Sequence, residues 1–111
     1  MGYRSQVAIA LHKSDWQKLR NSLIATGIYT EDDLRWAFSS IEEPREGYIV
    51  VSLDDTKWYE EYHDVKFIMD FLDGVEHQFV RIGDYYDDIE FRNTFKNGEA
   101  FFYPESFIKY L

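Results

Sequence analysis

Val7-Ala8-Ile9-Ala10-Leu11 decides the fold, because this stretch is apolar at every position. A strand with one wet face alternates apolar and polar side chains, whereas a strand covered on both faces is apolar throughout. The stretch therefore predicts a strand that is covered on each side or lies centrally in a sheet. We expect a single domain over residues 1–111, since a chain of 111 residues is long enough to bury one hydrophobic core.

Helical patterns follow this strand and return later in the chain. Ser14 and Gln17 have the spacing of a capping box, which predicts a first helix over residues 15–26. Thr30 can cap a second helix, and its expected inner stripe is Leu34, Ala37, Phe38 and Ile41. Apolar residues at helical spacing predict a third, longer helix over residues 56–72.

Apolar and alternating runs predict further strands over residues 48–53, 79–82 and 89–95, while residues 42–46 indicate a loop. The predicted order is β-α-α-β-α-β-β-β. This order favours an α+β fold with one mostly antiparallel sheet of four or five strands and helices packed on one face. The first two strands are apolar enough to be central, and strands joined through helices are open to parallel pairing. An open sheet edge also permits a homodimer.

Asn97-Gly98 has the composition of a two-residue hairpin turn, in which both central residues need positive φ. It predicts that residues 100–103 return as a last strand beside residues 89–95. The expected pairs are Phe95 with Ala100, Thr94 with Phe101, and Asn93 with Phe102. We expect residues 107–111 to pack as a short tail.

Charge restricts the partners of this chain. Twelve basic against 21 acidic side chains leave a formal charge of −9, which disfavours direct binding to nucleic acid or to an anionic membrane. Such charge either keeps a soluble chain apart from its neighbours or is displayed to a basic protein surface. With no cysteine, no apolar run of bilayer length and no leader-like start, we expect a cytoplasmic protein.

Acidic and aromatic residues gather in two segments, residues 83–90 and residues 54–64. Carboxylates so close together repel one another unless solvent or a cationic partner offsets them. A solvated turn and an acidic helix face are the plainer interpretations. Tyrosines beside carboxylates can also bury their rings against a partner while its Arg or Lys pairs with the charge. The predicted contact residues are Asp84, Tyr85, Tyr86, Asp87, Asp88 and Glu90, adjoined by Asp54, Asp55, Glu60 and Glu61.

Other polar and aromatic residues have competing interpretations. Arg81 and Arg92 fall on neighbouring predicted strands, where we expect them to pair with the acidic turn between them. Trp36 lies off the inner stripe of its helix, so it either anchors an interface or covers a neighbouring element.

Motifs for catalysis and metal binding are weak. The carboxylates of residues 84–90 lack the alternating spacing and central glycine of a calcium loop. His12-Lys13-Ser14 matches the His-x-Ser element of two-histidine phosphoesterases, but no second element follows, and Ser14 is better explained as a helix cap. We therefore expect a protein without enzymatic activity, metal or cofactor. The alternative is a small metal-dependent hydrolase that uses the carboxylates from Asp84 to Glu90. In such an enzyme, a carboxylate pair such as Asp55 and Asp88 could act as general acid and general base.

Two strings resemble a known group of proteins: Gly2-Tyr3-Arg4-Ser5-x-Val7-Ala8-Ile9-Ala10, and the run from Phe79 to Glu90, FVRIGDYYDDIE. They are similar to small uncharacterised acidic proteins encoded by bacteriophages and prophages, and they cover about a fifth of the chain. The resemblance implies a phage product in the cytoplasm of a bacterial host, where binding and inhibiting a host factor is a common role. It implies no functional residues.

Together these observations favour a non-enzymatic acidic binding protein, encoded by a phage, that engages a basic site on a host protein. The partner would be a host factor or a component of host defence, with mimicry of nucleic acid as one form of this binding. The alternatives are the metal-dependent hydrolase and a structural or accessory component of the phage.

Overall fold

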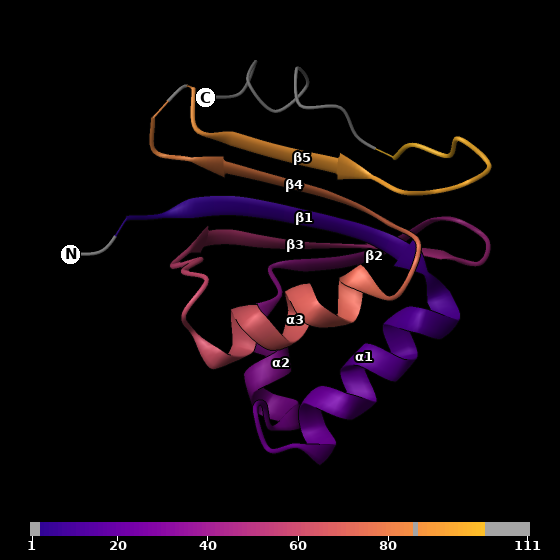
Figure 1. The fold of residues 1–111 in the computed structure, drawn as a ribbon. Helices are drawn as coiled ribbons and strands as arrows, with labels where there is room; N and C mark the ends of the chain where they lie inside the picture. The colour runs from indigo at the N-terminus through magenta and orange to yellow at the C-terminus, as the bar shows by residue number, and fades with distance from the viewer. Residues whose placement is uncertain (1–2, 86, 102–111) are drawn as a thin grey trace.

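Residues 3–85 and 87–101 are described by the computed structural model as one five-stranded sheet with three helices on one of its faces (Figure 1). The strands lie in the order β2-β3-β1-β4-β5, and each is antiparallel to its neighbours. Along the chain, the elements are β1 Ser5–His12, α1 Lys13–Ala25, α2 Glu31–Ala37, β2 Ser40–Arg45, β3 Tyr48–Thr56, α3 His63–Asp73, β4 His77–Gly83 and β5 Ile89–Asn93.

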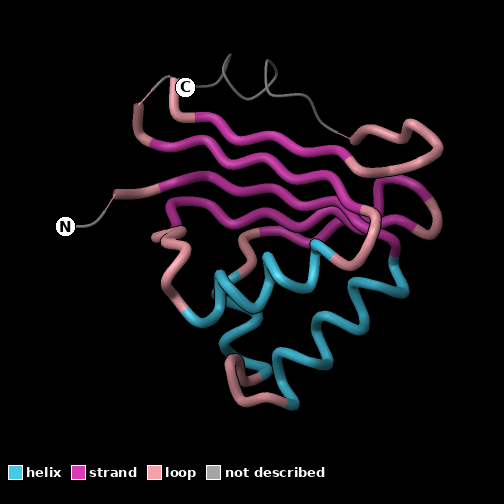
Figure 2. The backbone as a smooth tube through the Cα atoms, in the orientation of Figure 1, coloured by secondary structure: helices cyan, strands magenta, loops and turns pink. Residues whose placement is uncertain are grey.

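The α+β class, the antiparallel sheet and the helical layer, whose helices lie together on one side of the strands in Figure 2, are therefore confirmed. The pairs that β1 forms with β3 and β4, strands reached through helices, are antiparallel and not parallel. None of the described helices has the length and apolar content that a bilayer crossing requires.

Strand β1 is the centre of the sheet, as its unbroken apolar run predicts. Val7, Ile9 and Leu11 join the cluster on the helical side, while Ala8 and Ala10 join a second cluster. All five are at most 3% exposed. Both faces of this strand are therefore covered, one by the cluster beneath the helices and the other by the cluster that includes Phe95, which explains why the run carries no polar side chain.

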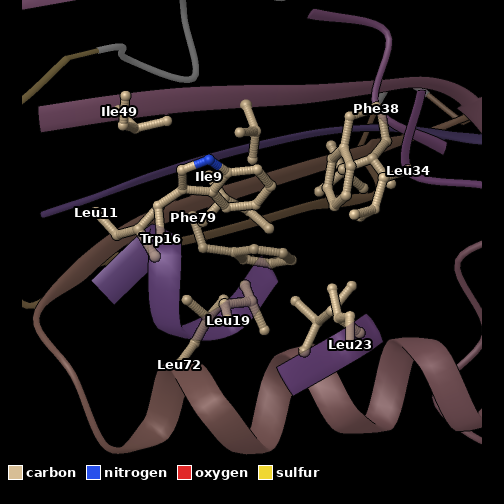
Figure 3. Packing of buried hydrophobic residues seen from close by; sticks show 14 residues of the cluster. Ile9, Leu11, Trp16, Leu19, Leu23, Leu34, Phe38, Ile49, Leu72 and Phe79 are labelled. Atoms are coloured by element: carbon tan, nitrogen blue, oxygen red, sulfur yellow. The ribbon is translucent and has the colours of Figure 1, made fainter. Parts of the chain in front are cut away.

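The main core lies between the helices and the sheet (Figure 3). Trp16 of α1 meets Phe38 edge to face, with ring centroids 5.2 Å apart and planes at 87°. Leu19, Leu23 and Leu72 from α1 and α3 complete the helical side of the cluster. Burial of each large apolar side chain contributes roughly 1.5–3 kcal/mol, so this layer fixes the helices on their face of the sheet.

Residues 42–46 are not the loop that Pro44 indicated, because they belong largely to edge strand β2. Proline is compatible with an edge strand, where its missing N–H breaks no ladder. Ile41 is consequently not on the inner stripe of α2: the helix ends at Ala37, and Ile41 pairs with Val51 and is 50% exposed. The capping box at the start of α2 is confirmed, with Thr30 and Asp33 bonding reciprocally.

Two helices begin elsewhere than predicted. Helix α1 starts at Lys13, directly after β1, and its N-cap residue His12 makes no capping bond through its side chain, so the expected capping box at Ser14 is not formed. Helix α3 starts at His63 and not near residue 56, because β3 continues to Thr56 opposite Ser5. Trp58 therefore packs from the connecting loop, with its ring 6.2 Å from that of Phe79.

The turn after β5 also differs from the expected hairpin. The amide of Gly98 donates to the carbonyl of Phe95, which centres the turn on residues 96–97 and places Gly98 at φ 77°. Asn93 explains the shift: its side chain accepts from Phe95 N at 3.1 Å and donates to Glu99 O at 2.9 Å, so it replaces the ladder with a local turn. Residues 100–101 form no strand, and residues 102–111, with the pair expected for Phe102 and the tail, lie outside the described residues.

Candidate functional site

The register of β1 brings the two acidic segments to one end of the sheet. Ser5, the first residue of β1, pairs with Thr56 at the end of β3 and with Gly83 at the end of β4. Neighbouring strands are about 4.8 Å apart, so the chain leaves β3 and β4 at points only ~10 Å apart. We call the exposed carboxylates gathered there the acidic end: Asp54, Asp55, Glu60, Glu61, Asp84, Asp87 and Glu90.

Tyr3 links the two segments. Its amide donates to the hydroxyl of Tyr59 at 2.6 Å, and its own hydroxyl donates to Asp88 Oδ2 at 2.6 Å. That hydroxyl also accepts from Tyr85 N at 3.1 Å. Gly83 makes this possible, because a Cβ at that position would overlap both the Tyr3 hydroxyl and the Asp88 carboxylate. The partners of Tyr3 lie 56 to 85 residues away in the sequence, so no local pattern identifies it.

Arg4 makes the second link. Its amide donates to Asp84 Oδ2 at 3.1 Å, and its guanidinium donates to the carbonyl of Asp55 at 3.1 Å. Asp55 has φ 51° and lies where the β1–β3 register shifts. A bulge of this kind bends the strand and re-aims its side chains, which here point Asp54 and Asp55 into solvent.

Asp88 belongs to the interior of the site and not to its exposed surface. Arg81, whose side chain is 12% exposed, donates to its two oxygens at 2.6 and 3.1 Å, and donates to Glu90 at 2.8 Å through Nε. The bonds from Arg81 and then from Tyr3 lower the pKa of Asp88, while the bond to Asp88 raises the pKa of Arg81. The predicted pairing of Arg81 with the acidic turn is confirmed.

Arg92 does not pair with the acidic turn. It donates to Asp73 at 3.2 Å, and its guanidinium lies 5.3 Å from the centroid of the Phe79 ring. The β4–β5 register explains this, because it places Arg92 opposite Phe79 and next to α3, away from residues 84–88.

The remaining predicted contact residues of the 83–90 segment differ in whether the structure describes them and in how exposed they are. Asp84, Tyr85 and Asp87 are exposed, and Tyr85 keeps 68% of its surface while its ring lies 5.6 Å from that of Tyr3. Tyr86 lies outside the described residues. Trp36 covers no neighbouring element, since it is 85% exposed on α2. Of the predicted contact residues that the structure describes, all except Asp88 are exposed, and their role in binding stays a prediction.

A groove of about 520 Å³ opens beside the acidic end, between α3, the loop before it and strands β4 and β5. We call it the α3 groove. It brings the two predicted segments together, because Glu60 and Glu61 line it with Asp88 and Glu90. Sequence reasoning did not place its other lining residues in one site: Tyr3, Trp58, Tyr59, Val65, Lys66, Met69, Asp70, Arg81 and Arg92. The sequence signals for them were the aromatic residues of the 54–64 segment, which include Trp58 and Tyr59, and the polar face of the third helix, which carries Lys66 and Asp70.

No group of three or more His, Asp or Glu side chains within residues 3–85 and 87–101 is arranged to hold a metal ion. The Asp88 carboxylate, half of the acid–base pair considered with Asp55, is bonded to Arg81 and Tyr3. No family model, curated protein or solved structure matches the chain. The acidic end and the α3 groove are therefore the features on which a function can be based.

Proposed function

We propose that this chain is a non-enzymatic acidic binding protein whose acidic end engages a basic site on another protein. The register of β1 with β3 and β4 is the observation that supports this, because it gathers exposed carboxylates from two distant segments at one end of the sheet. Two clusters that could each be an ordinary solvated turn become, side by side, one surface on which negative charge predominates.

The internal bonds of the site leave most of this charge unanswered. Arg81 offsets Asp88 and Glu90, and Arg4 lies near Asp55 and bonds Asp84 through its amide. The side chains of Glu60, Glu61 and Asp87 have no hydrogen bond or ion pair with any described residue. Like charges at such spacing repel, so a surface rich in Lys and Arg would bind here with favourable long-range attraction.

The setting we propose comes from the sequence resemblance: a phage protein in the bacterial cytoplasm that inhibits a host factor or a defence component. Carboxylates displayed at the end of a rigid sheet can occupy a site that otherwise receives phosphates, which makes a protein that holds nucleic acid the favoured class of partner. The exposed ring of Tyr85, which follows Asp84 in the chain, would supply apolar contact on this surface.

Affinity capture from bacterial lysate, with quantitative mass spectrometry, tests this function. The variant Asp84→Asn/Asp87→Asn removes two charges from the acidic end. A control, Glu42→Gln/Glu46→Gln, removes two charges from β2 and from the turn after it, on the far side of the sheet order. We expect the control to capture as much partner as the wild type, and the acidic-end variant to capture at least tenfold less. The amount captured by the wild type should decline as salt is added.

Capture that is equal for all three proteins would contradict the proposal, and so would capture that is insensitive to salt. Loss in both variants would show a dependence on net charge alone, which also contradicts a localised surface.

A further inference from the structure

We propose that the α3 groove receives an arginine side chain of the partner. The inference rests on the proposed function for the source of the arginine, and it adds a chemical identity to the contact. It is carried by three features of the groove: unpaired carboxylates, aromatic faces and the way this protein holds its own arginines.

The charges that line the groove do not balance. Arg81 is bonded to Asp88 and Glu90, and Arg92 is bonded to Asp73, so neither guanidinium is available to the remaining acids. Those acids are Glu60, Glu61 and Asp70, which are exposed and make no side-chain hydrogen bond or ion pair within the described chain. Lys66 is the one further cation on the lining. Three carboxylates against one ammonium leave the groove complementary to a cation.

Aromatic rings on the lining favour arginine over lysine as the cation that binds in the groove. Trp58 and Tyr59 are half-buried on the lining, held by Phe79 and by the Tyr3 amide respectively, and both rings are therefore fixed before binding. A planar guanidinium stacks on such rings and donates to carboxylates at its edge at the same time. A lysine ammonium is compact and strongly hydrated, and it gains less from a ring face.

The protein holds its own arginines with this combination of groups. Arg92 lies over the Phe79 ring and pairs with Asp73. Arg45 lies 5.8 Å from the centroid of the Phe101 ring and pairs with Glu99. In each case one aromatic face and one carboxylate hold one guanidinium. The α3 groove offers the same groups, from Trp58, Tyr59, Glu60 and Glu61, without an arginine of this chain between them.

The size of the groove agrees with this occupant. A volume of about 520 Å³ falls within the roughly 300–1,000 Å³ of sites that take small organic groups. Met69 and Val65 give the lining an apolar part, against which the methylene stem of an arginine can pack.

The test is a titration of the protein with two nine-residue peptides of equal charge, one with three arginines and one with three lysines. Tryptophan fluorescence is the readout, in a Trp36→Phe background that removes the exposed indole on α2 and leaves Trp58 on the groove and Trp16 buried in the core. We expect the arginine peptide to bind at least fivefold more tightly than the lysine peptide. Glu60→Gln/Glu61→Gln should abolish this preference, and the matched control Glu42→Gln/Glu46→Gln should keep it.

Equal affinity for the two peptides would overturn the inference, as would an unchanged preference in Glu60→Gln/Glu61→Gln. If that variant were unfolded by circular dichroism, Asp70→Asn on the exposed side of α3 would serve in its place, with the same expected loss. Failure of this inference is distinct from failure of the proposed function. If partner capture depends on Asp84 and Asp87 but the arginine peptide binds no more tightly than the lysine peptide, only the arginine site in the α3 groove is overturned. If the arginine peptide is preferred but no basic protein is captured, only the proposed function is overturned.

Discussion

Asp87 and Asp88 are adjacent aspartates, and we expect their substitution by asparagine to affect different properties: partner binding for Asp87 and stability for Asp88. Asp87 is exposed and makes no side-chain bond with a described residue. Asp88 accepts two bonds from Arg81 and one from Tyr3. Asp87→Asn should therefore weaken partner capture and leave stability unchanged, whereas Asp88→Asn should destabilise the fold.

The magnitude for Asp88→Asn follows from its bonds. Asparagine keeps one oxygen acceptor, loses the charge and turns an NH₂ toward the guanidinium of Arg81. At least one charge-assisted hydrogen bond is lost, which costs about 1.5–3 kcal/mol. A third of the Asp88 side chain is exposed and Glu90 still holds Arg81, so solvent and the second carboxylate keep the loss in the lower part of this range, at about 2 kcal/mol. For a domain of this size the melting temperature should fall by about 8 °C.

The pH dependence has a definite sign. Hydrogen bonding to Arg81 lowers the pKa of Asp88 below its unfolded value. A group with a lowered folded pKa contributes stability that is fully present above its unfolded pKa, about 3.9 for aspartate, and that is lost as the pH falls through the folded pKa. The difference between wild type and Asp88→Asn should thus be constant from pH 7 to pH 5 and shrink below pH 4.

Urea unfolding at pH 7, 5 and 3 measures these differences, with Asp87→Asn as the matched control. Equal free energies of unfolding for the two variants would refute the assignment of Asp88 to the interior of the site. A difference that grows as the pH falls would refute the role of the Arg81 pair.

Three further substitutions test the surroundings of the site. Gly83→Ala should cost about 1–3 kcal/mol by urea unfolding, because its Cβ overlaps the groups packed on that glycine, while Gly74→Ala, which meets only ordinary contacts, should be close to neutral. Tyr29→Phe should cost about 1 kcal/mol at pH 7, since it removes the 2.7 Å bond to Asp64. Burial and that bond raise the pKa of Tyr29, so its stabilisation is present below pH 10 and is lost as the pH rises through the raised value, and the cost should narrow in alkaline urea titrations. Trp36→Ser should change the free energy of unfolding by less than about 0.5 kcal/mol, because the indole is 85% exposed.

The core of the fold was predictable because its signals are local. An unbroken apolar run is enough to place β1 inside the sheet, and Thr30 with Asp33 is enough to begin α2. Ile41 was misplaced because an apolar residue four positions after the end of a short helix fits either a helix face or an edge strand, and the pairing with β3 decides between them.

The candidate site was predictable only in part, because its geometry depends on contacts between distant residues. Composition identified both acidic segments, and the strand register that joins them is non-local. Neither spacing nor residue type distinguishes Asp87 from Asp88. The distinction comes from Arg81 on the neighbouring strand and from Tyr3, whose hydroxyl reaches Asp88 across 85 positions of sequence.

A paramagnetic label tests most directly whether the two acidic segments form one surface. The chain has no cysteine, so Asp54→Cys gives a single labelled site on the first segment. Asp84 follows the end of β4, about two strand spacings (~10 Å) from the label across β1, and Asp87 lies in the turn that leads to β5, within about three spacings (~15 Å). Glu46 lies near the other end of the sheet, roughly 25 Å along the strands. The amide signals of Asp84 and Asp87 should be broadened strongly and that of Glu46 weakly. Equal broadening of all three, or none at Asp84 and Asp87, would contradict a shared acidic end.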